Sequence, residues 1–406
     1  MIADVGQASE RRLGDQPGGR QDARSVASAG RLLVVAGAVV AFLALALYQY
    51  RLPGLYYDEA ADVVPAMQLW LDQPVSLQRG VGIHLFGRDF PVMIGDYWGT
   101  TSTYAVLPLF AIFGIGVLPI RLFPIIAGGI AIVLSWQLGR RIFDDPVGIV
   151  AAVLLAVSPT FVFWSRIGIY VIAHIVPITL GVMLAYLSWR DRPRAWKLLL
   201  AGFLAGLGLT TKLLFVWFFI AMPVAYVALL LYDWLGADRS RVAIGARDQR
   251  GRSFIAFAME HIRRYLPARG FSDVMVIALA FGVGAFPVIY YNLASRGSYY
   301  LLRANLGSTE RGVDNLAFLD NFRQQLSELR IFLDGGYFWF LGGVYTNPIA
   351  TPVILSSVVG LVALTALPEH RRYRRPVLFL LAYAAAIFVL SCFSISILAA
   401  THLFIL

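Results

Sequence analysis

Long apolar runs recur along this chain of 406 residues, and they constrain its fold more than any other feature. A membrane-spanning helix needs roughly 17–25 mainly apolar residues, and the sequence offers about nine candidate runs, of which the fifth is short and interrupted by glycines. They are residues 32–50, 121–138, 147–164, 171–189, 198–211, 213–232, 274–292, 349–367 and 377–398. Because 59% of the residues are hydrophobic and only 14% are charged, we predict an all-α polytopic membrane protein. The same composition excludes a soluble enzyme and a disordered chain.

The distribution of positive charge predicts the orientation. Most of the 34 Lys and Arg residues fall in segments that nine spans and a cytoplasmic N-terminus would place inside the cell. These segments are 1–31, 139–146, 190–197, 233–273 and 368–376. Residues 51–120 and 293–348 then form large outer loops, and 233–273 is the longest cytoplasmic loop. The net charge of +10 is therefore explained by orientation in a membrane and not by nucleic-acid binding. We expect this membrane to be a bacterial plasma membrane.

Four segments depart from the pattern of simple spans. Residues 1–30 are polar and are predicted to be a disordered cytoplasmic tail before a transmembrane domain of residues 31–406. Residues 103–119 are apolar but rich in proline and glycine, which predicts a re-entrant or interfacial helix of the first outer loop. Residues 253–266 predict an amphipathic helix, either on the membrane surface or in a solvated loop. The apolar end at 399–406 indicates a fragment or a minimal protein.

Two adjacent carboxylates, Asp58 and Glu59, follow the first span directly and come after Tyr57. Carboxylates at membrane depth are costly and usually functional, whereas at the membrane surface they cost much less. A catalytic acid and an ordinary acidic helix cap are therefore both open. Asp62 closes the same short motif.

In a second part of the first outer loop, an acidic residue is next to aromatic residues. Asp96 and Tyr97 lie in the sequence Gly95-Asp96-Tyr97-Trp98-Gly99. Such residues can shape a polar pocket at the membrane surface, or form an aromatic belt that only anchors the protein. His84, His174 and His402 fall near the same predicted face but share no ligand spacing, so a metal site is only weakly indicated.

Arg166 and Lys212 are predicted at the outer face, against the trend of the positive-inside rule. This placement makes both candidates for holding an anion, although each could instead reach toward lipid phosphates.

The sequence contains no glycine-rich nucleotide loop, nucleophile elbow or HExxH motif. An ATPase, a serine hydrolase and a zinc protease are therefore disfavoured.

Taken in order, these motifs resemble those of the GT-C membrane glycosyltransferases, in particular the protein mannosyltransferase and aminoarabinose transferase groups. The resemblance runs from about residue 32 to the end of the chain. Its parts are Asp58-Glu59, Gly95–Gly99, Leu118-Pro119-Ile120-Arg121-Leu122-Phe123-Pro124, Leu138-Gly139-Arg140-Arg141-Ile142-Phe143, Ser158-Pro159, Ser165-Arg166 and Gly206-Leu207-Gly208 leading to Lys212.

The resemblance implies a GT-C-like fold, a polyprenyl-phosphate-linked sugar as donor, and catalysis at the extracytoplasmic membrane face. It implies that an acid of the first outer loop is catalytic, which points to Asp58 with Glu59 beside it. Relatives often carry a second acid shortly after the arginine that matches Arg166, but Ile167-Gly168-Ile169-Tyr170 offers none. A divalent metal ion is therefore a doubtful cofactor, and Asp96 is a candidate substitute for the missing acid.

The chemistry that follows is a single inverting displacement. A phosphate-linked sugar already carries a good leaving group, so the site needs a base for the acceptor hydroxyl and positive charge for the departing phosphate. Asp58 suits the first role, and Arg166 and Lys212 suit the second, with Tyr57, Tyr97, Asp96 and His84 lining the pocket. The acceptor can be a protein, a lipid or a glycan. The competing functions are a transporter or flippase for lipid-linked sugars and a non-catalytic subunit of an envelope assembly.

Overall fold

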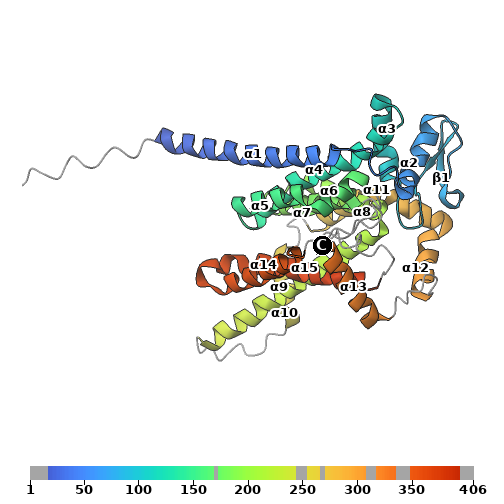
Figure 1. Cartoon of the computed structure of the whole chain (residues 1–406). Coiled ribbons are helices and arrows are strands. Elements are labelled where there is room, and N and C mark those ends of the chain that lie inside the picture. The colour runs from blue at the N-terminus through green and yellow to red at the C-terminus, as the bar shows by residue number, and fades with distance from the viewer. Residues whose placement is uncertain are drawn as a thin grey trace, which may run out of the picture.

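A computed structural model of the chain describes residues 17–168, 172–243, 254–265, 270–307, 317–334 and 348–393. Nearly all of the ordered elements are helices, as predicted, and they are arranged around a bundle of long helices (Figure 1). The α-helices are α1 (Pro17–Leu47), α2 (Tyr57–Trp70), α3 (Thr101–Phe113), α4 (Val117–Ile142), α5 (Asp145–Val157), α6 (Pro159–Ile167), α7 (Ile172–Asp191), α8 (Ala195–Thr211), α9 (Val216–Ala243), α10 (Phe254–Tyr265), α11 (Phe271–Ser295), α12 (Gly297–Gly307), α13 (Phe318–Leu333), α14 (Ala350–Ala366) and α15 (Arg374–Ser391). Short 3-10 turns lie at Gln78–Gly80, Leu213–Phe215 and Pro368–Tyr373, and the strands are β1 (Gly82–Leu85) and β2 (Arg88–Pro91).

The first half of the bundle packs α1 against α4, α5 and α6. Its core contains Phe42 of α1, Ile132 of α4 and Phe161 of α6, and the rings of Phe42 and Phe161 lie 5.6 Å apart. The chain bends by 61° between α5 and α6, where Ser158 ends one helix and caps the next through the backbone N–H of Phe161. Ser followed by Pro159 at the first helical position is a strong start signal, so the predicted span at 147–164 is broken.

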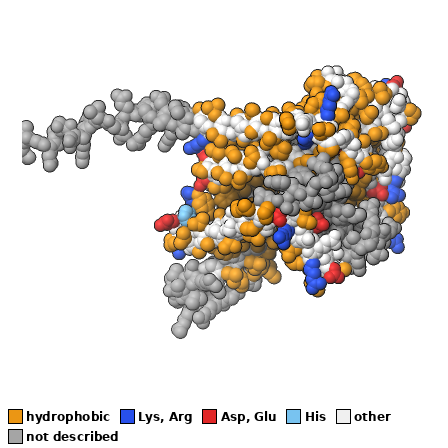
Figure 2. Space-filling view, viewed as in Figure 1, with side chains coloured by type: hydrophobic (Ala, Val, Ile, Leu, Met, Phe, Trp, Pro, Cys, Tyr) orange, Lys and Arg blue, Asp and Glu red, His pale blue; other side chains and the backbone are white. Residues whose placement is uncertain are grey.

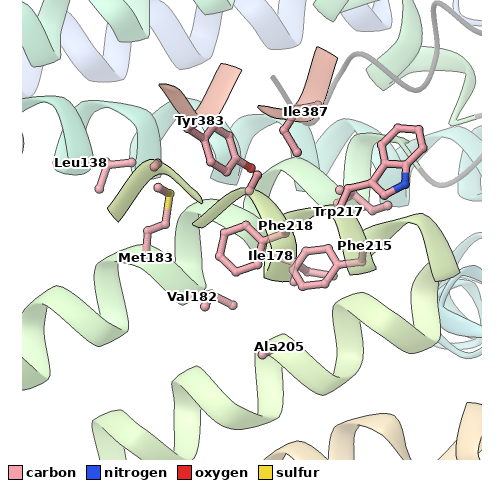
Figure 3. Packing of buried hydrophobic residues seen from close by; sticks show 13 residues of the cluster. Leu138, Ile178, Val182, Met183, Ala205, Phe215, Trp217, Phe218, Tyr383 and Ile387 are labelled. Carbon is pink, nitrogen blue, oxygen red and sulfur yellow. The ribbon is translucent and has the colours of Figure 1, made fainter. Parts of the chain in front are cut away.

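The second half is built on α7, α8, α9, α11 and α15. Helix α8 packs against α7 and along α11, and α9 packs against α15. Figure 3 shows the apolar cluster between these helices, where Phe215, Phe218 and Tyr383 meet aliphatic side chains of α7. The close approach of α8 and α11 depends on glycine, because a Cβ on Gly206 would lie 2.2 Å from the carbonyl oxygen of Phe281.

The predicted count of nine spans is not confirmed. Among the described residues, five helices are long and apolar enough to cross a membrane, or six if the bent pair α5–α6 counts as one span. The predicted spans at 198–211 and 349–367 correspond to α8 and α14, which are shorter apolar helices. The predicted span at 121–138 begins earlier, at Val117, because the glycines at 114 and 116 end α3 and start α4.

The four segments that were expected to depart from simple spans have different outcomes. Helix α1 begins at Pro17, so the second part of the predicted disordered tail is helical, and residues 1–16 lie outside the described residues. Most of the apolar segment 103–119 belongs to the 13-residue helix α3, which begins at Thr101 and is too short to cross a membrane, and its last three residues start α4. A helix in 253–266 is confirmed as α10, which contacts α9 through Phe254 and Trp234. Residues 394–406, which include the predicted apolar end and His402, lie outside the described residues.

The first outer loop forms a compact cap at one end of the bundle. Figure 1 shows α2, α3, the β1–β2 hairpin and α12 gathered at this end, with α12 coming from the second predicted outer loop. Asp96 links the two loops, because its side chain accepts a hydrogen bond from Tyr291 of α11 and its backbone carbonyl accepts one from Ser298 at 2.6 Å. We did not predict the hairpin, in which His84 pairs with Asp89.

The opposite end of the bundle collects the segments predicted to be cytoplasmic. Ion pairs join Arg31 to Asp145 and Arg141 to Asp191. Tyr373 donates to Asp144 at 2.5 Å, and Arg375 pairs with Asp233 at 2.9 Å. These contacts connect all five of the positively charged segments, so the two predicted classes of loop lie at opposite ends. Between them, hydrophobic side chains predominate on the bundle surface, as expected for a surface facing lipid (Figure 2).

Candidate active site

Asp58 and Glu59 occupy the first turn of α2, where the partial positive charge of a helix N-terminus favours acidic residues. Glu59 is 2% exposed and pairs with Arg121 of α4, with Nε–Oε1 and Nη2–Oε2 distances of 3.1 Å each. Asp58 is partly exposed. The two neighbours in sequence therefore have different surroundings, and Asp58 is the one that solvent can reach.

The Glu59–Arg121 pair also fixes the connection between α1 and α2. The guanidinium of Arg121 donates to the backbone carbonyls of Tyr50, Pro53 and Gly54, at 2.9 Å for Pro53 and 3.2 Å for Gly54. Burial raises the pKa of Glu59, whereas the hydrogen bonds and charge of Arg121 lower it. Glu59 thus supports the local architecture, and its partner Arg121 was not singled out in the sequence because a contact across 62 positions has no local signal.

Asp62 lies one helical turn after Asp58, so both carboxylates belong to the same side of α2. Its side chain is buried, with the residue 6% exposed, and its Oδ2 has no hydrogen-bond partner among the described residues. Trp98 donates a side-chain hydrogen bond to the carboxylate, and Thr103 donates to the backbone carbonyl at 3.0 Å. Burial raises the pKa of Asp62 to about 7, Lys212 lowers it, and Asp58 raises it further.

Lys212 follows the last residue of α8 and is 3% exposed. Burial lowers the pKa of its ammonium group to about 8, while the charges of Asp62 and Asp58 raise it. The structure therefore brings Lys212 close to both carboxylates of α2. Asp58 and Lys212 were predicted site residues, whereas Asp62 was not. The sequence feature that could have indicated Asp62 is its spacing of four residues from Asp58, which puts both on one side of a helix.

The loop around Trp98 joins these groups together. Trp98 pairs with Lys212 as an isolated antiparallel bridge, and the N–H of Leu213 donates to the carbonyl of Tyr97 at 2.8 Å. Glycine is required for this approach, because a Cβ on Gly99 would lie 2.3 Å from the carbonyl oxygen of Thr210. The Gly95–Gly99 motif thus attaches the first outer loop to the end of α8.

Asp96 is the anchor of this loop. Its carboxylate accepts hydrogen bonds from Arg79 at 2.8 and 2.7 Å, from Gln78 at 3.0 Å and from Tyr291. The guanidinium of Arg79 holds the pKa of Asp96 well below its ordinary range, helped by Tyr291 and Gln78. These contacts already engage the carboxylate, so the structure gives it little freedom to act as a second catalytic acid.

Arg166 lies near the start of the first outer loop but binds the protein's own backbone. Its guanidinium donates to the carbonyls of Gln49 and Leu52, just after α1. Its charge acts on Glu59, and that of Arg121 acts on it. Arg166 and Arg121 together therefore hold the α1–α2 connection, and the positive charge of Arg166 acts on Glu59.

The remaining predicted pocket residues lie around this centre or away from it. Tyr57 is 81% exposed at the start of α2, and Tyr97 packs edge-on against Trp98 with ring centroids 4.5 Å apart. His84 lies on the exposed face of the hairpin, where its side chain is 69% exposed and its Nδ1 is 3.0 Å from Asp89. The two tyrosines border the loop end of the bundle, whereas the contacts of His84 are within the hairpin.

A small pocket lies behind α2, bordered by α3, α4 and α7. Glu59, Asp62, Ser102 and Phe123 line it, together with His174. His174 is 3% exposed and stacks on Phe123 with centroids 4.3 Å apart; both of its ring nitrogens lack partners within the described part of the chain. No group of three or more His, Cys, Asp and Glu residues is arranged to hold a metal ion in that same part. The ligand set for a divalent metal is therefore incomplete there.

Comparison with known proteins supports the predicted resemblance. Residues 103–236 match the family described as dolichyl-phosphate-mannose-protein mannosyltransferase. The fold is similar to that of the protein in "Crystal Structure of ArnT from Cupriavidus metallidurans bound to Undecaprenyl phosphate", with a TM-score of 0.53 and 14% identity. That match covers 92% of this chain and 57% of the ArnT chain, so this chain spans little more than half the length of that protein. No curated protein matches the sequence. The family match and the shared fold confirm the resemblance to the GT-C membrane glycosyltransferases.

Proposed function

We propose that the chain is a membrane glycosyltransferase that moves a sugar from a polyprenyl-phosphate carrier to an acceptor hydroxyl at the extracytoplasmic membrane face. The observation that carries the proposal is the grouping of Asp58, Asp62 and Lys212 at the loop end of an ArnT-like fold. A base and a buried cation next to each other are what a displacement at a phosphate-linked sugar requires. The undecaprenyl phosphate bound by the similar ArnT protein is consistent with such a donor.

Asp58 is the general base of the proposed reaction. Its carboxylate takes the proton of the acceptor hydroxyl as the oxygen attacks the anomeric carbon. The bond from that carbon to the phosphate oxygen breaks, and the electron pair leaves with the polyprenyl phosphate. Attack and departure occur on opposite faces of the sugar, so the anomeric configuration inverts.

Lys212 and Arg166 supply positive charge for the departing phosphate. Lys212 is the stronger candidate, because it is buried and close to Asp58, and an ion in a low-dielectric site interacts more strongly than one in water. Arg166 contributes its charge from the α1–α2 connection while its hydrogen bonds go to backbone carbonyls.

The other residues of the loop shape the site. Asp96 holds the loop to α11, and Glu59 holds α2 to α4. Tyr57 and Tyr97 are assigned to the acceptor side of the proposed site. The acceptor is a protein, lipid or glycan hydroxyl, and membrane lipids surround the bundle.

Release of polyprenyl phosphate tests the proposal. The purified full chain is given a series of polyprenyl-phosphate-linked sugars with candidate acceptors, and product and released carrier are measured. The two lysines of the chain provide a matched pair, because both are buried at opposite ends of α8. Lys212→Met should weaken donor binding by about 1.5–3 kcal/mol, the range for charge-assisted hydrogen bonds. Lys197→Met, which removes bonds to the carbonyls of Ser188 and Arg192, should leave donor binding unchanged.

Other outcomes identify the competing functions. Movement of intact lipid-linked sugar across vesicles without release of carrier would indicate a transporter or flippase. Equal donor binding by both lysine variants would remove Lys212 from the site.

A further inference from the structure

We propose that Asp62 is a positioning residue of this site: buried and linked to Lys212 through Trp98, it is the counter-charge that keeps the lysine cationic while the phosphate binds and leaves. This inference rests on the proposed function and deepens it. The sequence has no acid shortly after Arg166. The inference assigns the role of the second acid to Asp62 of α2, which lies one turn after Asp58.

The placement of Asp62 is fixed from two sides. The backbone of Trp98 is paired with that of Lys212, and the side chain of Trp98 donates to the carboxylate of Asp62. From α3, Thr103 donates to the backbone carbonyl of Asp62 at 3.0 Å. The carboxylate, the indole and the lysine are therefore held as one unit, and Asp62 cannot swing out to solvent as a surface acid can.

Lys212 needs a counter-charge that does not change during the reaction. An isolated ammonium group is costly to bury, and it is retained in the charged form only beside an opposite charge. Asp58 supplies part of that charge, but a general base becomes neutral when it takes the acceptor proton. Asp62 is buried, so it has no access to the acceptor and does not take its proton. Above a pH of about 7, where its carboxylate is ionised, Asp62 therefore holds Lys212 charged while the leaving phosphate gains charge.

The other charged or titratable groups around Asp62 do not replace this partner. Glu59, on the same helix, is matched by Arg121 at 3.0 Å. His174 of α7 lines the pocket behind Asp62 and stacks on Phe123. The charges that act on Asp62 are those of Lys212 and Asp58, and Lys212 is the one of opposite sign.

The protonation of Lys212 can be followed directly, because the chain contains two lysines. The full chain is labelled with 13C-lysine, and its spectrum is recorded against pH in wild type, Asp62→Asn and Asp62→Glu. Lys197→Arg in each background leaves one lysine signal. We expect Lys212 to titrate near pH 8 in wild type. Removal of a nearby opposite charge shifts a pKa by about 1–3 units, so the midpoint should fall by at least about one unit in Asp62→Asn and stay close to wild type in Asp62→Glu.

Binding of undecaprenyl phosphate as a function of pH gives the second readout. Because the cationic lysine binds the anion, affinity should fall as pH rises through the midpoint of Lys212, and this fall should begin at lower pH in Asp62→Asn. Asp72→Asn, an exposed acid paired with Arg88, serves as the control and should match wild type. A general loss of folding would lower affinity at every pH without moving the midpoint.

The possible results separate this inference from the proposed function. If wild type binds undecaprenyl phosphate and the Lys212 midpoint is the same in Asp62→Asn, the role of Asp62 is wrong and the glycosyltransferase proposal stands. If wild type does not bind undecaprenyl phosphate at any pH, both are wrong. A shifted midpoint in both readouts supports the inference.

Discussion

Asp58 and Glu59 show how one helical turn separates two adjacent carboxylates. Side chains at neighbouring positions of a helix point in directions about 100° apart, so they meet different surroundings. Glu59 turns inward to Arg121, whereas Asp58 stays at the edge beside Lys212. The sequence predicted that both acids matter, but only the long-range contact with Arg121 separates the structural acid Glu59 from Asp58, the proposed catalytic acid.

This difference predicts that substitutions at the two acids affect stability unequally. Glu59→Gln leaves the guanidinium of Arg121 buried without its charge partner, and removal of one partner of a buried pair costs about 3–5 kcal/mol. Thermal unfolding of the purified protein should therefore occur at a markedly lower temperature in Glu59→Gln, while Asp58→Asn should unfold close to wild type. Similar melting temperatures in Glu59→Gln and wild type would show that the pair does not hold α2 to α4.

At the scale of elements, sequence patterns located the helices well and their junctions poorly. Apolar runs identified α1, α4, α9 and α11, because helices in lipid are apolar on nearly all faces. The break at Ser158 and the hairpin were missed, since a short capping motif and two four-residue strands are weak signals within and beside long apolar runs. The role of the glycines in the Gly95–Gly99 motif became clear only from the contact with α8.

Gly99→Ala tests whether that contact positions the site. The added Cβ would lie 2.3 Å from a backbone carbonyl oxygen of α8, which no side-chain adjustment can relieve. Overpacking of this kind costs typically about 1–3 kcal/mol, and here it should also displace Trp98 from Lys212. We expect lower stability and weaker binding of undecaprenyl phosphate. Gly116→Ala, where a Cβ has open space, is the control, and equal binding by the two variants would contradict the role of the loop.

At the scale of the whole molecule, the loops segregate to two ends as the distribution of positive charge predicted. The count of nine spans is not confirmed, because several apolar helices of the described residues are short or bent. Ion pairs such as Arg375–Asp233 nevertheless join positively charged segments that lie far apart in sequence. Which of the site residues meet depends on these long-range contacts. Asp58 and Lys212 were candidates from their residue type and predicted side, while the contacts of Asp62 and Arg121 became visible only in the structure.

Cysteine labelling tests which end faces outward. A cysteine at Ser76 in the first outer loop should react with an impermeant thiol reagent added to intact cells, and a cysteine at Glu369 should react only after the membrane is opened. Both positions are exposed, and the native Cys392 is buried, so background labelling should be low. Labelling of the Glu369 position in intact cells would invert the orientation and place the candidate site in the cytoplasm.

The transfer rate of Asp58→Asn is the most direct test of the central claim, that this carboxylate activates the acceptor hydroxyl. Asparagine keeps the shape of the side chain and removes the proton acceptor, and a positioned general base contributes typically about 10²–10⁴-fold in rate. Measured on purified protein at equal folded concentration, with Asp72→Asn as the control, transfer by Asp58→Asn should fall by that factor while its melting temperature stays near that of wild type. Transfer at the wild-type rate, or a loss of activity matched by a loss of folded protein, would contradict the assignment.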